Sequence, residues 1–190
     1  LVACLQLELF RVLELLNAND NSQLITSGRV DPLMIPQISQ APGLVQLVLN
    51  FLQALEQQGF TGDTATSYAD RLTMATDNSI YQLLPDAVLF PRSTADVALL
   101  ARLASEERFK TLVFTPRGGG TGTNGQSLNK GIVVDMSRYM NRIIEINPEQ
   151  GWVRVEAGVI KDQLNQYLKP YGYFFAPELS TSNRATLGGM

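Results

Sequence analysis

Residues 116–125 read P-R-G-G-G-T-G-T-N-G, a run of glycines and two threonines behind a single arginine. The residues in front of this run, 111–114 (T-L-V-F), predict a buried strand, so the glycines lie where a strand leaves its sheet. Glycine reaches positive φ without a Cβ penalty, and successive backbone N–H groups can then form a concave nest for an anion. The hydroxyls of Thr121 and Thr123 would add donors and Arg117 would add positive charge. The run therefore predicts a phosphate or diphosphate site.

Two better-known glycine loops are excluded. Gly120, Gly122 and Gly125 spell G-x-G-x-x-G, but the dinucleotide fingerprint needs a helix that begins at its last glycine. Only residues 126–131 separate the loop from the apolar run 132–134, which predicts another strand. A Walker loop fails because no G-K-[ST] follows at the required spacing. The pattern indicates a strand-to-strand phosphate nest, with a glycine-rich hairpin that binds no ligand as the alternative.

Composition limits the chemistry. The chain has 190 residues, enough for one domain or slightly more, and its 15 basic and 18 acidic side chains give a net charge of −3. This charge predicts no nucleic-acid partner. No histidine is present, which removes Ser-His and Cys-His pairs and the commonest metal ligand. The single cysteine, Cys4, cannot form a zinc site or an iron–sulfur cluster, so we predict no metal site and expect any chemistry to come from an organic cofactor.

The first 84 residues carry the weaker signals. Apolar residues at helical spacing over 1–16 predict an amphipathic helix, whose charges exclude a signal peptide or a transmembrane segment. Residues 1–33 are either a packing segment or an upstream extension before a true start at Met34. Residues 34–84 form a helical lead-in, with a helix over 44–55 that Gly59 ends and a short helix over 68–75.

From Pro85 onward, strands and helices alternate. A strand over 87–90 precedes a helix that begins at Ser93, with Asp96 three residues later, and the strand over 111–114 completes a β-α-β unit. Further strands are expected over 132–136, 142–146 and 152–156, with a hairpin turn over 147–151. A helix over 159–168 and a strand over 173–175 follow. The aromatic residues Trp152, Tyr173 and Phe174 are expected in the core.

The last residues, 177–190, read P-E-L-S-T-S-N-R-A-T-L-G-G-M. A hydroxyl-rich turn that precedes Gly188 and Gly189 predicts a second close approach of the backbone to a ligand, with a frayed end as the alternative. The chain stops without a cap or a charged tail, so we expect a truncation inside a domain.

Four blocks follow one another in a fixed order. They are P-R-G-G-G-T-G from Pro116, G-I-V-V-D-M-S-R from Gly131, I-I-E-I-N-P-E-Q-G-W-V-R-V-E-A-G-V from Ile143 and P-E-L-S-T-S-N-R-A-T-L-G-G from Pro177. Together they resemble the FAD-binding domain of the vanillyl-alcohol oxidase family, also called the p-cresol methylhydroxylase-type or FAD-linked oxidase family. The resemblance covers residues 85–190, extends back to Met34 and leaves out 1–33. It implies an α+β fold: a first subdomain with a small mixed sheet and flanking helices, and the start of a second, truncated one.

Within that family, the motifs are most similar to those of the bacterial D-2-hydroxyglutarate dehydrogenases that carry a C-terminal iron–sulfur region. D-lactate dehydrogenases and glycolate oxidases are the related alternatives. The resemblance implies an FAD-dependent enzyme that oxidises a small 2-hydroxy acid, D-2-hydroxyglutarate above all, by hydride transfer to FAD. The electron acceptor is not identified, and an iron–sulfur cluster would belong to the missing C-terminal part. It also implies a cytoplasmic protein, peripheral at the inner membrane if its electron acceptor lies there.

The resemblance also places the cofactor on residues of this chain. Thr121 occupies the position where relatives with covalent FAD often carry a histidine, so FAD is expected to be non-covalent. No catalytic residue is assigned. Two alternatives remain open: a truncated, non-catalytic fragment, or a reductase of the same fold that makes UDP-N-acetylmuramate. The residues assigned to FAD binding are Pro116, Arg117, Gly118, Gly119, Gly120, Thr121, Gly122, Thr123, Asn124, Gly125, Pro177, Ser180, Thr181, Thr186, Gly188 and Gly189.

Overall fold

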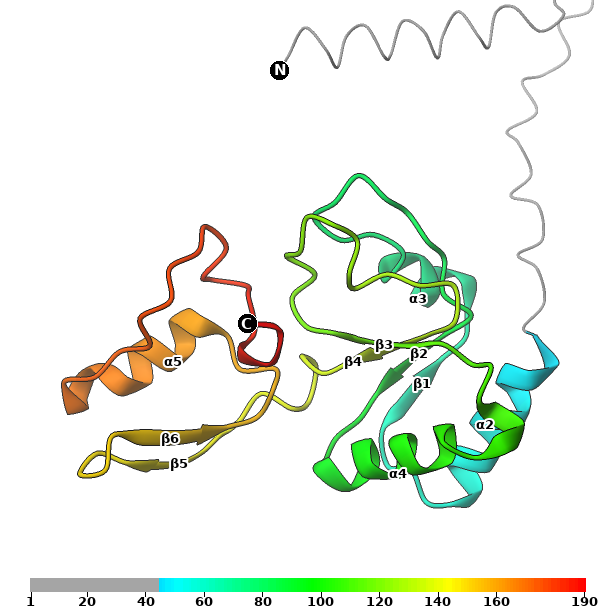
Figure 1. The fold of residues 1–190 in the computed structure, drawn as a ribbon, viewed down its shortest axis with the longest axis horizontal. Coiled ribbons are helices and arrows are strands. Elements are labelled where there is room, and N and C mark those ends of the chain that lie inside the picture. Colours follow the sequence, from blue (N-terminus) through cyan, green and yellow to red (C-terminus); the bar gives the residue numbers. More distant parts are fainter. Residues whose placement is uncertain (1–44) are drawn as a thin grey trace, which may run out of the picture. The chain divides into compact units, whose positions relative to one another are not determined.

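The first part of the fold is a four-stranded mixed sheet (Figure 1). The computed structural model describes residues 45–190, so the helix predicted over 1–16 and the start proposed at Met34 lie outside the described residues. In spatial order the strands are β1 (Asp63–Ala65), β2 (Ala87–Phe90), β4 (Ile132–Asp135) and β3 (Phe114–Arg117). Strands β2, β4 and β3 run parallel, and β1 pairs with β2 in the antiparallel sense.

The predicted β-α-β unit is present as β2, the helix α4 (Thr94–Ala104) and β3. Its two strands are not neighbours, however, because β4 lies between them. The lead-in also contributes β1 to the sheet, a strand that the polar pattern of residues 61–79 does not reveal. The sheet therefore joins segments that the sequence pattern separates.

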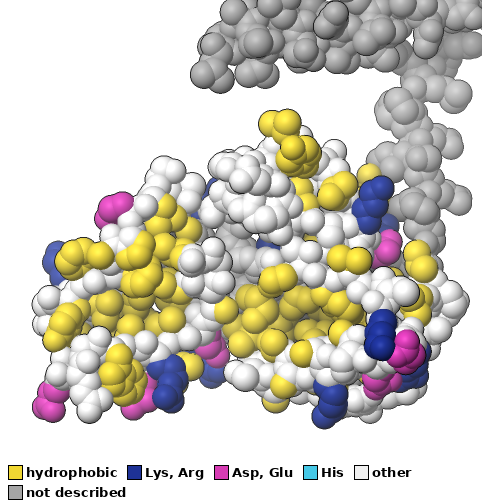
Figure 2. Space-filling model, in the orientation of Figure 1, with side chains coloured by type: hydrophobic (Ala, Val, Ile, Leu, Met, Phe, Trp, Pro, Cys, Tyr) yellow, Lys and Arg dark blue, Asp and Glu magenta, His cyan; other side chains and the backbone are white. Residues whose placement is uncertain are grey.

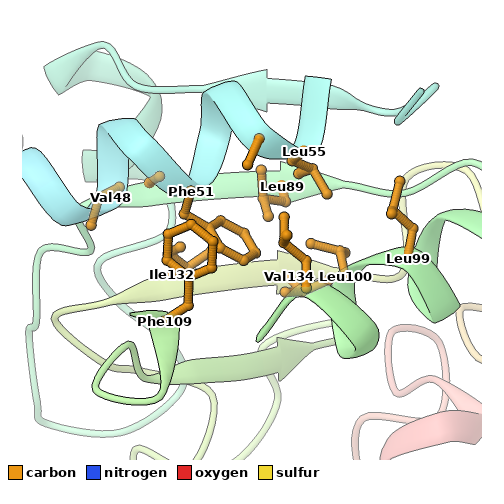
Figure 3. Packing of buried hydrophobic residues seen from close by; sticks show 12 residues of the cluster. Val48, Phe51, Leu55, Leu89, Leu99, Leu100, Phe109, Ile132 and Val134 are labelled. Atoms are coloured by element: carbon orange, nitrogen blue, oxygen red, sulfur yellow. The ribbon is translucent and has the colours of Figure 1, made fainter. Parts of the chain in front are cut away.

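The two central strands are buried on both faces. Ala87 and Leu89 of β2 face one apolar cluster, and the alternate residues Val88 and Phe90 face another, as the period of two in a strand requires. The larger cluster lies between the sheet and the helices α2 (Gln46–Gln57) and α4 (Figure 3). In it the ring of Phe51 meets that of Phe109 edge-on at 5.2 Å between centroids. This core fixes the strand ends from which the glycine loop emerges.

The helix predicted over 44–55 is confirmed as α2. Its C-cap is Gln58, and the following Gly59 has φ +86°, the left-handed conformation expected one residue after the cap. The short helix predicted over 68–75 is α3 (Tyr68–Thr73), which Ser67 caps by accepting from the N–H of Asp70. Ser93 caps α4 in the same way, through the N–H of Asp96 at 3.2 Å.

The strand predicted over 111–114 begins three residues late, at Phe114. The 3₁₀ helix η1 (Glu107–Phe109) continues into a turn, in which the N–H of Leu112 donates to the carbonyl of Phe109 at 2.9 Å. Val113 is 58% exposed, so the prediction of a buried strand there is wrong. The strand instead includes Pro116 and Arg117 of the glycine motif. It is an edge strand, and such strands tolerate a proline because its missing N–H can face away from the ladder.

The second part of the fold is a hairpin with a helix packed on one face. Strands β5 (Ile143–Asn147) and β6 (Trp152–Val155) pair antiparallel, and Gly151 takes φ +69° in the predicted turn between them. The predicted helix is α5 (Lys161–Leu168), followed by the 3₁₀ helix η2 (Lys169–Tyr171). Val159, Leu164 and Leu168 form the small core between this helix and the hairpin.

Two predictions for this second part are wrong. Residues 173–175 form no strand, because the N–H and carbonyl groups of Phe175 bind the side-chain amide of Asn165 instead of a ladder partner. The three aromatic residues expected in the core are exposed: Trp152 by 37%, Tyr173 by 45% and Phe174 by 70%. Figure 2 shows hydrophobic side chains spread over the region of β5, β6 and α5 on this face.

Asp96 ties the first turn of α4 to the segment after α2. Its side chain is 3% exposed and accepts from the backbone N–H of Thr61 and of Arg92, each at 2.9 Å. Burial would raise the pKa of this carboxyl, but the hydrogen bonds from Thr61 and Arg92 outweigh it and hold the pKa below its ordinary value of 3.8. The folded state therefore favours the charged carboxylate.

We predict that Asp96→Asn lowers the free energy of unfolding by about 2 kcal/mol at neutral pH, because one buried N–H loses its charged acceptor. The folded carboxyl has the lower pKa, so its contribution is complete above pH 3.8 and is lost as the pH falls through the folded pKa. The difference between wild type and variant should therefore shrink in acid. Urea unfolding at a series of pH values measures it.

Asp70→Asn is the matched control, because Asp70 holds the same position behind Ser67 in α3 but is exposed. We expect it to change the free energy of unfolding by less than about 0.5 kcal/mol. Equal losses in the two variants would contradict the anchoring role of Asp96.

Candidate functional site

The glycine loop lies at the carboxyl ends of two parallel strands. It leaves β3 after Arg117 and returns to β4 at Ile132, and no helix lies between these residues, as predicted. The ladder of the two strands ends with the N–H of Met136, which donates to the carbonyl of Arg117 at 2.8 Å. Crevices beyond the carboxyl ends of parallel strands are the usual place for ligands in sheets of this kind.

Most backbone N–H groups of this loop donate to no protein acceptor. Within residues 118–125, the N–H of Asn124 donates to Oε1 of Gln126 at 3.1 Å. The loop carbonyls of Gly120 and Gly125, in contrast, accept from Asn78 and Leu128, each at 3.0 Å. Successive backbone donors that are not used by the protein can bind an anionic group. Within residues 118–125, the N–H groups that donate to no acceptor in residues 45–190 are those of Gly118, Gly119, Gly120, Thr121, Gly122, Thr123 and Gly125.

The loop needs its glycines for two different reasons. Gly120 has φ +63°, a conformation that residues with a Cβ rarely adopt. Gly118 and Gly119 instead allow a close approach of the chain end. A Cβ on Gly118 would lie 2.0 Å from Oγ1 of Thr186, and one on Gly119 would lie 2.1 Å from the carbonyl oxygen of Arg184. The backbone of the glycine loop therefore meets the tail loop, residues 177–190, at the side chain of Thr186 and at the backbone of Arg184.

The tail loop is held in place by its own backbone. The carbonyl of Thr181 accepts from the N–H groups of Arg184 and Ala185, each at 2.8 Å. The N–H of Gly188, within the 3₁₀ helix η3 (Leu187–Gly189), donates to Ala157 at 2.8 Å. Thr186 forms an antiparallel bridge with Ile160. The tail is therefore docked along residues 157–160, and the alternative of a frayed end is wrong.

Three cavities surround the contact between the two loops, and Gly119 lines all of them. A cavity of about 410 Å³ also contains Gly118, Arg184 and Thr186 in its wall. A second, of about 260 Å³, is lined by Arg117, Gly120, Thr121 and Thr181 among others. The third, of about 200 Å³, is lined by Pro116, Gly118, Gly119, Gly120, Thr121, Gly122, Gln126, Ser127, Leu179, Ala185, Thr186, Gly189 and Met190.

The structure thus brings most of the predicted site residues together. Those that line these cavities are Pro116, Arg117, Gly118, Gly119, Gly120, Thr121, Gly122, Thr181, Thr186 and Gly189. The remaining six line none of the three: Thr123, Asn124, Gly125, Pro177, Ser180 and Gly188. Gly125 instead packs beside Tyr81, and Gly188 packs against Ala157.

Arg117 acts as an anchor beneath the loop. Its Nη2 donates to the carbonyl of Thr76 at 2.7 Å, and its Nη1 donates to the hydroxyl of Ser127 at 3.4 Å. Burial lowers the pKa of this guanidinium, although the negative charges of Asp135 and Asp77 act to raise it. It remains a cation, and a Cβ on Gly120 would lie 2.6 Å from its Nη2. The positive charge expected here is present, but its hydrogen bonds hold the loop.

Two carboxylates line the cavities and are bound by local donors. Asp77 accepts from the N–H of Ser79 at 2.8 Å and from the hydroxyl of Ser127 at 3.0 Å. Burial would raise the pKa of Asp77, but these hydrogen bonds and the charge of Arg117 hold it below 3.8. Asp135 accepts from the N–H and hydroxyl of Ser137, both at 2.8 Å. Both carboxylates are therefore hydrogen-bonded within the protein.

Sequence reasoning missed several residues of the cavity walls. Arg184 lies inside the quoted run S-T-S-N-R-A-T, where it is the only charged residue, and that signal was available. Ser137 lies inside the quoted block G-I-V-V-D-M-S-R, so that signal was available too, whereas Asn78 comes from a segment without a recognisable motif. In residues 45–190 no group of three or more His, Cys, Asp or Glu is arranged to hold a metal ion. None of the helices in this range has the length and apolar character that crossing a bilayer requires.

Comparison with known proteins identifies close relatives. The chain is 89% identical over 157 residues to the D-2-hydroxyglutarate dehydrogenase of Escherichia coli (strain K12). This match covers 83% of this chain and 15% of that protein. It is 83% identical over 157 residues to the D-2-hydroxyglutarate dehydrogenase of Pantoea ananatis (strain AJ13355), with the same coverage of 83% and 15%. The chain thus spans about 15% of the length of these curated relatives.

The fold is also that of proteins with little sequence similarity. A solved structure of alkyldihydroxyacetonephosphate synthase superposes with a TM-score of 0.63 at 20% identity, over 74% of this chain and 28% of that one. The predicted fold class, an α+β domain of the p-cresol methylhydroxylase type, is confirmed. A family model described as an FAD binding domain matches residues 85–190. The chain belongs to this family of FAD-binding domains.

Proposed function

We propose that the chain holds the diphosphate of a non-covalently bound FAD in an oxidoreductase that acts on D-2-hydroxy acids, with D-2-hydroxyglutarate as the favoured substrate. The observation that carries the proposal is the cluster of unpaired N–H groups from Gly118 to Thr123 beside the tail loop. Backbone amides exposed by small residues bind a diphosphate without help from a helix. FAD, when bound, would take up the hydride from the α-carbon of the hydroxy acid.

The substrate class rests on the relatives. Both relatives named above are D-2-hydroxyglutarate dehydrogenases, and their identity to this chain exceeds 80%. The chain spans about 15% of their length, so the reaction of the whole protein is carried over by similarity alone. The proposal assigns no catalytic residue to residues 1–190, because groups that bind the hydroxy acid are expected elsewhere in such a protein.

The residues of the two loops would hold and shape the cofactor site. The N–H groups of Gly118 to Gly122 would donate to the diphosphate, and Thr121, Thr181 and Thr186 would add hydroxyl groups along the cavity walls. Arg117 would keep the loop in place and contribute its charge from below. The remaining assigned residues would shape the two loops: Pro116, Thr123, Asn124, Gly125, Pro177, Ser180, Gly188 and Gly189.

The wider setting is part of the same proposal. The substrate is a small molecule, and electrons would leave FAD for an acceptor that no feature of residues 45–190 identifies. Cys4 alone cannot hold an iron–sulfur cluster, so any cluster would be bound outside these 190 residues. A cytoplasmic location, with peripheral membrane association through the acceptor, rests on the resemblance to bacterial dehydrogenases.

We predict that the protein, purified at its full natural length, shows flavin absorbance that D-2-hydroxyglutarate bleaches under anaerobic conditions. The L-enantiomer should leave it unchanged, because hydride transfer requires the α-hydrogen to face the flavin. Stopped-flow absorbance measures the reduction. Bleaching by NADPH but not by D-2-hydroxyglutarate would instead support the reductase that makes UDP-N-acetylmuramate, and protein without any flavin affinity would support a non-catalytic fragment.

We predict that Gly119→Ala weakens FAD binding by at least about tenfold, the effect of one lost charge-assisted hydrogen bond. The added Cβ would lie 2.1 Å from the backbone oxygen of Arg184, so the two loops must separate. A titration of flavin-free protein with FAD, followed by flavin fluorescence, measures the dissociation constant.

Gly151→Ala in the β5–β6 turn is the control. Its φ of +69° makes alanine strained, with a stability cost of about 1 kcal/mol, but no atom lies within 4 Å of the added Cβ. FAD affinity should be unchanged in this variant. Full FAD affinity in Gly119→Ala would count against the two-loop site.

A further inference from the structure

Arg184 lies at the junction of the two loops. Its carbonyl oxygen is the atom nearest to a Cβ built on Gly119, at 2.1 Å, and its own N–H donates to Thr181 at 2.8 Å. The residue lines both the cavity of about 410 Å³ and that of about 260 Å³. The backbone is thus fixed directly beside the unpaired N–H groups of the glycine loop, and the side chain starts from there.

The side chain of Arg184 has no protein partner in the described part of the chain. The residue is exposed, and its guanidinium forms no hydrogen bond or ion pair with any residue in 45–190. A guanidinium offers five N–H donors in a planar fork, which matches the oxygens of a phosphate group in a bidentate arrangement. An arginine free of protein acceptors is therefore available for an oxyanion.

The other charged groups around these cavities are already engaged. Arg117 donates to the carbonyl of Thr76 and to Ser127, so its donors are directed at the protein. Asp77 is bound by Ser79 and Ser127. Asp135 is bound by Ser137 and by the N–H of Arg138 at 3.0 Å. No carboxylate in these two cavity walls pairs with Arg184, which leaves its charge uncompensated within residues 45–190.

We propose that the side chain of Arg184, in the tail loop, binds the FAD diphosphate. Its positive charge is opposite to that of the diphosphate, and it lies next to the glycine loop that supplies the backbone donors. The inference rests on the proposed function, because it takes the ligand to be FAD. It adds a side-chain cation to a site that otherwise binds through neutral N–H groups. Affinity for the diphosphate would then depend on both loops at once, and on salt concentration through Arg184.

The test uses the full-length protein after removal of flavin, titrated with FAD, with ADP and with riboflavin. Arg184→Gln should weaken FAD and ADP binding by about tenfold to a hundredfold, the range of charge-assisted hydrogen bonds. Riboflavin lacks the phosphates, so its affinity should not change. Arg184→Lys keeps the charge but loses the fork, and an intermediate loss for FAD is expected. Calorimetry gives the dissociation constants, and FAD affinity should fall less steeply with NaCl in Arg184→Gln than in wild type.

Arg154→Gln is the matched control. Arg154 is an exposed residue of β6, and its Nη1 lies 3.5 Å from Oε2 of Glu145. Replacing Arg154 by glutamine removes the same positive charge, but at a position outside the two loops. Its FAD affinity should equal that of wild type, and thermal unfolding without FAD should confirm that both glutamine variants are folded. If Arg184→Gln does not fold, a selective loss of FAD and ADP affinity in Arg184→Lys would support the inference, and no loss would overturn it.

Two results separate this inference from the proposed function. Wild-type FAD affinity in Arg184→Gln, or an equal loss in Arg154→Gln, would overturn the role of Arg184 and leave FAD binding intact. Wild-type protein that binds neither FAD nor ADP would overturn the proposed function and this inference with it.

Discussion

The close approach of two backbone segments is the constraint on which the site depends. Gly118 and Gly119 meet the tail at Arg184 and Thr186 at distances that leave no room for a Cβ on either glycine. Each segment is fixed by a different core. The sheet with α2 and α4 holds the glycine loop, and the hairpin with α5 holds the tail. The contact therefore connects two separately packed parts of the chain, and the donors of the loop lie at their junction.

This arrangement would allow an acidic chain to present the proposed anion site. The net charge is −3, so attraction must come from local groups. The ladder between β3 and β4 ends at Arg117, and the N–H groups of residues 118–123 beyond it have no acceptor among residues 45–190. Asp77 and Asp135 lie in the cavity walls, but local donors hold both. In the proposed site, backbone dipoles would thus provide the positive potential that side-chain counts do not show.

Much of the local structure was predictable because it depends on nearest neighbours. Ser93 with Asp96 began a helix, Gly59 ended one and Gly151 turned a hairpin, and each is set by backbone geometry over a few residues. The errors arose where distant segments compete. Val113 looks like a strand residue, yet β3 starts after it because β4 pairs from Phe114 onward. Phe174 looks like a core residue, but within residues 45–190 it is 70% exposed.

By itself, the amino-acid sequence determined that the chain has a glycine loop between two strands, that no helix or histidine assists it, and that a hydroxyl-rich tail follows. These properties reside in residue type and short spacing. Only the tertiary structure decided that the two loops touch, that Arg117 is an anchor and that Arg184 is free. Those facts depend on which atoms meet across more than sixty residues of chain, between Gly118 and Thr186, and hydrophobic packing of two cores selects that meeting.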